Sequence, residues 1–155
     1  MRLLACVAFA LAVANGLAVT ATPATSAACK PTVGDTPGPW SQRPLDAPRR
    51  AKIGTGHVLQ GRVVRATDCK AVFRALVVFW QAGADGYGPT GRASVMTDRL
   101  GRFRFEGPVP ASYGGRPPHI HIAVIHPAYK VLFTRYVVQR GAKSGRIRIV
   151  LTPLL

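Results

Sequence analysis

Short apolar segments separated by turn residues make up the chain from residue 53 onward. β-branched and aromatic side chains favour strands, whereas clusters of Gly, Pro and Asp favour turns. No stretch of helix length repeats its apolar residues with the 3.6-residue period of a helix. The pattern predicts an all-β protein of about seven strands, which is typical of a β-sandwich. The expected strands are 57–64, 75–81, 93–97, 102–106, 119–126, 131–138 and 146–151.

The first 28 residues have the composition of a cleaved secretory signal. Arg2 supplies a positive charge, residues 3–19 are almost wholly apolar, and small residues lead up to Ala28. This order is typical of export signals, and the apolar run is short for a membrane span of about 20 residues. We therefore expect an exported protein, periplasmic or secreted, with residues 1–28 removed. A retained membrane anchor is the alternative.

The remaining chain is expected to have two parts. Residues 29–52 are rich in Pro and Gly and should form an arm that wraps the domain, pinned by Trp40, with a disordered linker as the alternative. Residues 53–155 form the β-sandwich domain. Cys29 and Cys69 are the two cysteines beyond the signal, and in an oxidising compartment we expect them to form a disulfide.

The chain is strongly basic, with 21 Lys and Arg against 6 Asp and Glu and a formal net charge of +15. Such a charge attracts anions of several kinds. The basic residues are scattered, however, and neither a basic helix nor an RNA-binding aromatic signature is present. We expect no specific nucleic-acid partner and no membrane span, whereas self-association into a homo-oligomer stays open.

A pair of histidines two residues apart lies in one expected strand. Side chains two apart on a strand point to the same face, so His119 and His121 should project together. Two imidazoles on one rigid face form half of a metal site. The same spacing also occurs on solvated strand faces, so the pair alone does not establish a metal ion.

Two tyrosines lie among glycines, where an aromatic ring has little local packing reason to be. Tyr87 is expected in the turn after strand 75–81, and Tyr113 directly precedes the histidine segment. Phenolate is a hard anionic donor that suits Fe(III), whereas the common ferrous oxygenase site uses two histidines and a carboxylate. Acidic residues are scarce in this chain, so a phenolate-rich site fits the composition. Ordinary loop tyrosines are the alternative.

Four segments together resemble the intradiol ring-cleavage dioxygenases, the family of catechol and protocatechuate 3,4-dioxygenases. They are residues 59–64, 79–87, 97–105 and 113–121, and the resemblance covers roughly residues 31–138. Its most specific part is Tyr113 followed by Arg116, Pro117 and the His119-x-His121 pair. The resemblance implies a transthyretin-like (prealbumin-like) β-sandwich with a non-haem Fe(III) centre.

The resemblance also implies a role for each matching residue. Tyr87 and His119 are expected as equatorial iron ligands, and Tyr113 and His121 as axial ligands. The implied reaction inserts both atoms of O2 into a catechol between its hydroxyl-bearing carbons and gives a cis,cis-muconate. Tyr113, displaced by the substrate, would act as a general base. Arg116 would bind the substrate and stabilise its negative charge.

One position departs from the family pattern near the expected oxygen pocket. The chain reads Thr134-Arg135-Tyr136 where family members usually carry Thr-Gln, so Arg135 brings a cation that is expected to contact the substrate. No segment of this sequence is expected to form the helical dimerisation domain of the catechol enzymes. The alternative function is a non-enzymatic, exported, transthyretin-like binding module for an acidic polymer or protein, which the basic charge would favour.

Three further residues are expected to have structural positions and no role in the site. Trp80 should pack in the core, and Asp98 should fix a turn with Gly101. His57 is expected to lie on the surface of its strand.

Overall fold

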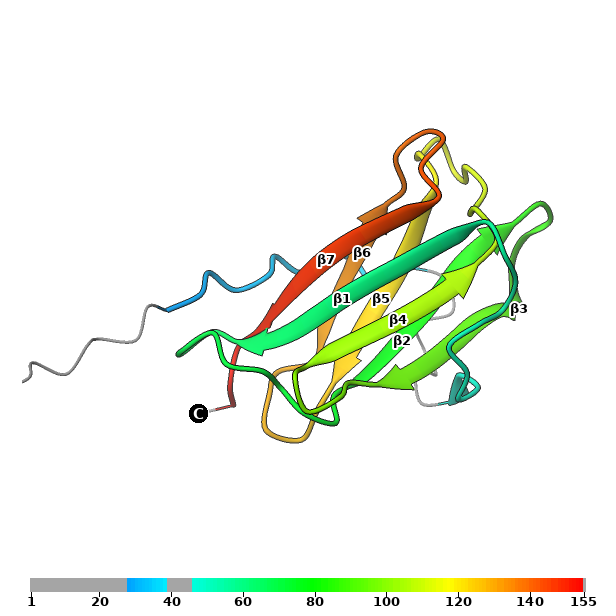
Figure 1. Ribbon diagram of the computed structural model, residues 1–155. Coiled ribbons are helices and arrows are strands. Elements are labelled where there is room, and N and C mark those ends of the chain that lie inside the picture. Colours follow the sequence, from blue (N-terminus) through cyan, green and yellow to red (C-terminus); the bar gives the residue numbers. More distant parts are fainter. Residues whose placement is uncertain (1–27, 39–45, 155) are drawn as a thin grey trace, which may run out of the picture.

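The computed structural model describes residues 28–38 and 46–154. Trp40 and nearly all of the expected signal segment therefore lie outside the described residues. Within the described part, seven strands form two sheets that pack face to face (Figure 1). The predicted all-β sandwich is confirmed. None of the described residues belongs to a helix long and apolar enough to cross a membrane.

The two sheets contain three and four strands. The smaller sheet has the order β4-β1-β7 and the larger sheet the order β3-β2-β5-β6. Hydrogen-bonded neighbours are antiparallel, apart from the parallel pair of β1 and β7. The strands are β1 (His57–Arg65), β2 (Leu76–Gly83), β3 (Gly86–Met96), β4 (Arg102–Gly107), β5 (His119–Ile125), β6 (Leu132–Val137) and β7 (Ser144–Leu151).

The main core lies between the sheets and is rich in phenylalanine. The ring of Phe79 on β2 stacks on Phe105 of the opposite sheet at 4.5 Å between centroids, and Phe103 lies 5.6 Å away. Strands β1 and β4 alternate buried and exposed side chains, because only one face of their sheet meets the core. Strands β2 and β5 are buried on both faces instead.

A second apolar cluster explains why the outer face of the larger sheet is also buried. Val78, Trp80 and Ala123 point away from the main core, and Ala47 of the segment that precedes β1 packs on them. The prediction that Trp80 is a core residue is confirmed, since its side chain is 2% exposed. The outer face of this sheet therefore offers a sheltered apolar surface beside any polar groups that lie on it.

Strand β3 begins seven residues earlier than predicted, and this is a correction. The expected strand started at Ala93, whereas β3 starts at Gly86 and therefore includes Tyr87. The segment contains Gly88 and Pro89, which have low strand propensity. It is tolerated because β3 is an edge strand, where a missing backbone donor can face solvent, and because a bulge interrupts its pairing with β2.

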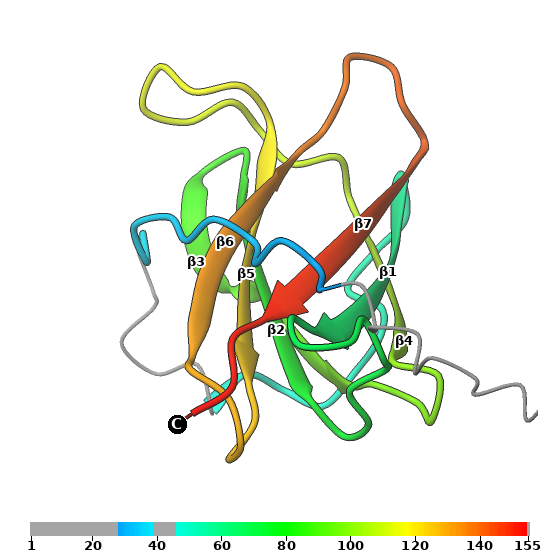
Figure 2. The ribbon, with the colours of Figure 1, turned by 90° about the vertical axis from the view of Figure 1, so that its left-hand side faces the viewer.

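The N-terminal arm crosses the edge of the sandwich, next to β6 and β7 (Figure 2). The amide of Thr32 donates to the carbonyl of Val150 at 3.1 Å, and the amide of Asp35 donates to the carbonyl of Phe133 at 2.8 Å. The predicted disulfide is confirmed: Cys29 is bonded to Cys69 across 40 positions of sequence. The arm thus connects the Cys69 turn to the face of the larger sheet.

Asp98 behaves as predicted in the structure, whereas His57 does not. The carboxylate of Asp98 accepts from the amides of Leu100 and Arg102, and its carbonyl accepts from the amide of Gly101, which confirms the predicted turn. The surface position expected for His57 is wrong. Its side chain is 1% exposed, because the ring stacks on Tyr136 and its Nδ1 lies 2.8 Å from the carbonyl oxygen of Ala142.

Gly101→Ala is expected to destabilise the fold by about 3 kcal/mol, whereas Gly141→Ala should lose about 1 kcal/mol. Both glycines have positive φ, 72° and 75°. A Cβ on Gly101 would strike the carbonyl oxygen of Val63, but on Gly141 it would meet no described atom within 4 Å. Urea unfolding of both variants measures the difference. Equal losses would show that the contact with Val63 relaxes without cost.

Candidate metal centre

The predicted histidine pair lies at the start of β5, on the outer face of the larger sheet. Ile120 and Ile122 point into the main core, so the alternation of the strand directs His119 and His121 to the opposite face. Tyr87 reaches the same place from the start of β3. Strand β2 lies between β3 and β5, and both of its neighbours pair with it. The topology, not local sequence, therefore brings the phenol to the imidazoles.

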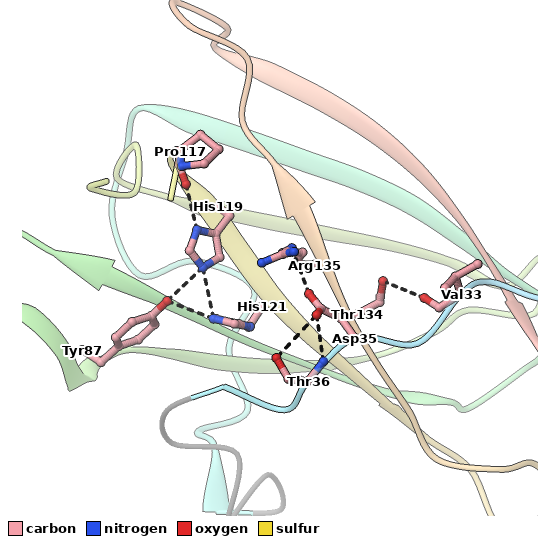
Figure 3. Close-up of polar contacts among 9 residues, drawn as sticks. All are labelled: Val33, Asp35, Thr36, Tyr87, Pro117, His119, His121, Thr134 and Arg135. Carbon is pink, nitrogen blue, oxygen red and sulfur yellow. Dashed lines mark hydrogen bonds and ion pairs between the residues drawn. The ribbon is translucent and has the colours of Figure 1, made fainter. Parts of the chain in front are cut away.

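Three donor atoms converge at this point (Figure 3). The hydroxyl oxygen of Tyr87 lies 3.1 Å from Nε2 of His119 and 2.9 Å from Nε2 of His121, and the two Nε2 atoms are 3.1 Å apart. We call this set the donor triangle. Both imidazoles are almost fully buried, with exposed fractions of 3% and 1%.

The donor triangle has too few protons to hydrogen-bond along all three of its edges. Nδ1 of His119 lies 2.8 Å from the carbonyl oxygen of Pro117, which can only accept, so this nitrogen carries the proton. When Nε2 carries no proton, the ring therefore presents a lone pair to the other two donor atoms. The Tyr87 hydroxyl and Nε2 of His121 can supply at most two protons for three edges. At least one edge therefore lacks a hydrogen bond of its own, whereas a central cation could bind all three donor atoms.

The spacing of the donor triangle also suits a metal ion. Donors about 2.1 Å from one ion and at right angles to each other are separated by about 3 Å. The three observed separations fall in this range. Among the described residues, no group of three or more His, Cys, Asp or Glu gathers around one point. A metal ion at this place would therefore rely on phenol oxygen as well as imidazole nitrogen.

Burial sets the protonation of these groups. It lowers the pKa of His121 to about 4, and the neighbouring His119 adds to this effect, so the ring is neutral at physiological pH. Burial raises the pKa of the Tyr87 phenol, and the Arg116 guanidinium opposes that rise. A neutral imidazole can ligate a metal ion directly, whereas the phenol must lose its proton to the bound cation.

Trp80 and Gly38 hold the ring of His121 from two sides. The indole of Trp80 stacks on the imidazole, with centroids 5.2 Å apart and an angle of 6° between the planes. Gly38, in the N-terminal arm, has a φ of 71°, and a Cβ built on it would lie 2.5 Å from Cε1 of His121. Nothing in the sequence marks Gly38 as a site residue, because it is one of several glycines in the Pro-rich arm.

Tyr113 and Arg116 lie at the mouth of the site. They line a pocket of about 340 Å³ together with Thr36, Gly38, Tyr87, Gly114, His119 and His121. The ring of Tyr113 meets the ring of Tyr87 edge to face at 5.0 Å and is 47% exposed. Tyr113 therefore lies beside the donor triangle rather than within it. The volume is near the lower end of the range for small-molecule sites, which is enough for one aromatic ring.

Arg135 lies next to the site but is not part of the pocket wall. It faces His121 across the pairing of β5 and β6, and its Nε forms an ion pair of 2.8 Å with the carboxylate of Asp35 (Figure 3). Asp35 belongs to the arm, so this ion pair joins the arm to the strand beside the histidines. Sequence reasoning did not include Asp35, since only the folded arm places it there.

No protein-family model matches the sequence, and no curated protein matches it significantly. Solved structures do match the fold. The dioxygenase domain of a dioxygenase carbohydrate-binding protein fusion from Streptomyces sp. SirexAA-E is 24% identical, with a TM-score of 0.68 over 81% of this chain and 100% of that chain. An intradiol ring-cleavage dioxygenase from Tetranychus urticae is 16% identical, with a TM-score of 0.69 over 82% and 97%.

Catechol 1,2-dioxygenase from Acinetobacter radioresistens is a third match. It is 18% identical, with a TM-score of 0.60 over 70% of this chain, and the match spans 59% of that longer enzyme. The chain therefore has the β-sandwich fold found in intradiol ring-cleavage dioxygenases.

Gly38→Ala is expected to weaken metal binding roughly tenfold or more, because the new methyl group would displace the His121 ring. Gly114→Ala is the matched control. It lines the same pocket and also has positive φ, 59°, but its Cβ would meet no described atom within 4 Å. Titration of both variants with Fe(III) provides the measurement. Equal affinity in the two variants would show that the arm does not position His121.

Proposed function

We propose that this protein is a non-haem Fe(III)-dependent intradiol ring-cleavage dioxygenase. In the proposed reaction both atoms of O2 enter a catechol, the bond between the two hydroxyl-bearing carbons breaks, and a cis,cis-muconate forms. The observation that carries the proposal is the donor triangle of Tyr87, His119 and His121, with Tyr113 beside it. The shared fold supports it.

The proposed iron ligands are the two phenols and the two imidazoles. Tyr87, His119 and His121 already present their donor atoms to one point, and the ring packing of Trp80 against His121 limits reorientation. Tyr113 would complete the set from the mouth of the pocket. When bound, ferric iron would act as a Lewis acid that lowers the pKa of the catechol hydroxyls and draws electron density from the ring.

Tyr113 and Arg116 are proposed to act on the substrate. The Tyr113 ring is partly exposed, so it can move aside when a catechol enters. If Tyr113 has already lost its proton as a metal ligand, its phenolate oxygen would accept a proton from a substrate hydroxyl. Arg116 lines the same pocket and forms no ion pair among the described residues. Its guanidinium is therefore available to stabilise negative charge on the bound ring.

Arg135 is proposed to contribute less to substrate binding than Arg116. Its ion pair with Asp35 offsets part of its charge, and its side chain does not line the pocket. We propose that it stabilises an anionic ligand mainly through its field at the edge of the site.

Purified protein loaded with Fe(III) is expected to be burgundy and to consume one O2 for each catechol converted to muconate. Phenolate-to-iron charge transfer gives the colour, so Tyr113→Phe should shift the visible band and slow oxygen uptake. Tyr129→Phe is the control, because that ring packs against His126 away from the pocket. A colourless iron-loaded protein, or no oxygen uptake with simple and carboxylated catechols, would exclude the proposal.

We also propose that residues 1–28 direct export of the protein. The disulfide between Cys29 and Cys69 supports this, because structural disulfides persist in oxidising compartments. Mass spectrometry of the protein recovered outside the cytoplasm should find a chain that begins at Cys29, and a retained N-terminus would refute the assignment.

The alternative function, a non-enzymatic binding module for an acidic polymer or protein, is less well supported. Such a module has no need for a phenol and two imidazoles that converge on one point.

A further inference from the structure

The outer face of the smaller sheet carries a concentrated positive charge. Strand alternation directs every second side chain of β1, β4 and β7 away from the core. Five of these outward positions are exposed arginines, which we call the arginine face: Arg62, Arg102, Arg104, Arg146 and Arg148.

The strand register aligns these arginines in rows. Arg62 in the central strand is directly paired with Arg102 on one side and with Arg148 on the other. In the neighbouring row Gln60 lies between Arg104 and Arg146. Like charges directly opposite each other in a sheet are destabilising. The arrangement therefore works against folding, and a bound anion would offset the repulsion.

Carboxylates balance only part of this charge. Arg102 pairs with Asp98 at 2.9 Å, and Arg104 pairs with Glu106 at 2.8 Å. Arg62, Arg146 and Arg148 form no ion pair with any described residue; Nε of Arg62 donates instead to the carbonyl of Leu100 at 2.9 Å. Three guanidinium groups thus keep most of their donors for a ligand.

The shape of the arginine face suits an extended polymer. Adjacent strands are about 4.8 Å apart, and side chains two apart along a strand are separated by about 7 Å. These distances are comparable to the length of one sugar unit in a chain. Figure 1 views the molecule onto this sheet. The five arginine positions are exposed, whereas Val64 and Val150, the outward residues at the other end of β1 and β7, are buried. The metal centre lies on the far face of the other sheet, so the two surfaces are separate.

We propose that the arginine face is a docking surface for a polyuronate, an acidic polysaccharide with a carboxylate on each sugar. A guanidinium matches a carboxylate with two parallel hydrogen bonds. No aromatic ring occurs among the other outward residues of the three strands, which are Val58, Gln60, Val64, Glu106, Ser144 and Val150. Single-stranded nucleic acid is held largely by base stacking. The lack of a stacking platform counts against single-stranded nucleic acid, and the bidentate match of guanidinium with carboxylate favours the polyuronate.

Binding of the full-length protein to polygalacturonate tests the proposal. The variant Arg62→Gln/Arg146→Gln/Arg148→Gln is expected to bind roughly tenfold or more weakly, because it removes the unpaired cations. The control variant Arg49→Gln/Lys130→Gln/Arg140→Gln removes the same charge from exposed positions outside β1, β4 and β7 and should bind like the parent protein. Fully methyl-esterified polygalacturonate, which lacks the charge, should not bind.

Three outcomes would overturn the assignment. Equal losses in the two triple variants would show that only net charge matters. Tighter binding of single-stranded DNA or of anionic vesicles than of polygalacturonate would assign the arginine face to another partner. No binding to polygalacturonate at low salt would exclude it directly. Iron content and visible colour should be the same in both variants, so the result is independent of the proposed dioxygenase activity.

Discussion

Tyr87→Phe is expected to lower Fe(III) affinity by roughly a hundredfold or more and to remove most of the visible band. The change deletes the phenol oxygen of the donor triangle and leaves two imidazole nitrogens facing each other. Loss of an outer hydrogen-bond partner of a metal ligand already reduces affinity 10–100-fold by typical estimates, so loss of a ligand should cost at least as much. Equilibrium dialysis and the visible spectrum measure the two effects.

Tyr136→Phe is the matched control for this experiment. Tyr136 stacks on His57 on the side of the main core, so its hydroxyl cannot reach the donor triangle. The control should keep both iron affinity and colour. Unchanged iron binding in the Tyr87 variant would show that the donor triangle is only a hydrogen-bonded cluster. The further observation of normal circular dichroism would separate loss of the ligand from loss of the fold.

Phe79→Ala is expected to destabilise the protein by about 4 kcal/mol. The side chain is fully buried, and its ring joins the two sheets through contacts with Phe103 and Phe105. Removal of the ring leaves a cavity at the centre of the sandwich, where neither sheet can close the gap without moving the other. The free energy of unfolding from denaturant titration gives the measurement.

Phe73→Ala makes the same chemical change at an exposed position. The Phe73 side chain is 48% exposed, so its loss should change stability by less than about 0.5 kcal/mol. A similar loss in both variants would mean that the effect comes from the unfolded chain and not from the core. A small loss at Phe79 would show that the two sheets repack around the cavity.

The sequence predicted the role of Tyr87 in the site but not its secondary structure. Its identity as a site residue was predicted, but its place in a turn was wrong, because Gly88 and Pro89 carry no strand signal. Edge pairing with β2 supplies the backbone hydrogen bonds that local propensity does not. Such pairing depends on contacts distant in sequence, so propensity could not reveal it.

The N-terminal arm is a second case in which local sequence patterns did not indicate tertiary contacts. Composition predicted a Pro-rich segment that wraps the domain, and the cysteine pair was read correctly as a disulfide. Neither feature indicated that Gly38 would press on His121 or that Asp35 would pair with Arg135. Both contacts require the arm to run beside β6, where the amide of Asp35 donates to the carbonyl of Phe133.

The sequence by itself determined the sandwich and the common face of His119 and His121. Strand alternation follows from backbone geometry and can be read from the order of residues. Only the tertiary structure decided how strands distant in sequence become neighbours. Strand order in the larger sheet brings Tyr87 to the histidines, and the register of β1 with β4 and β7 aligns the arginines. These alignments depend on which sheet edges pair and which apolar faces are buried together, and no local pattern encodes that choice.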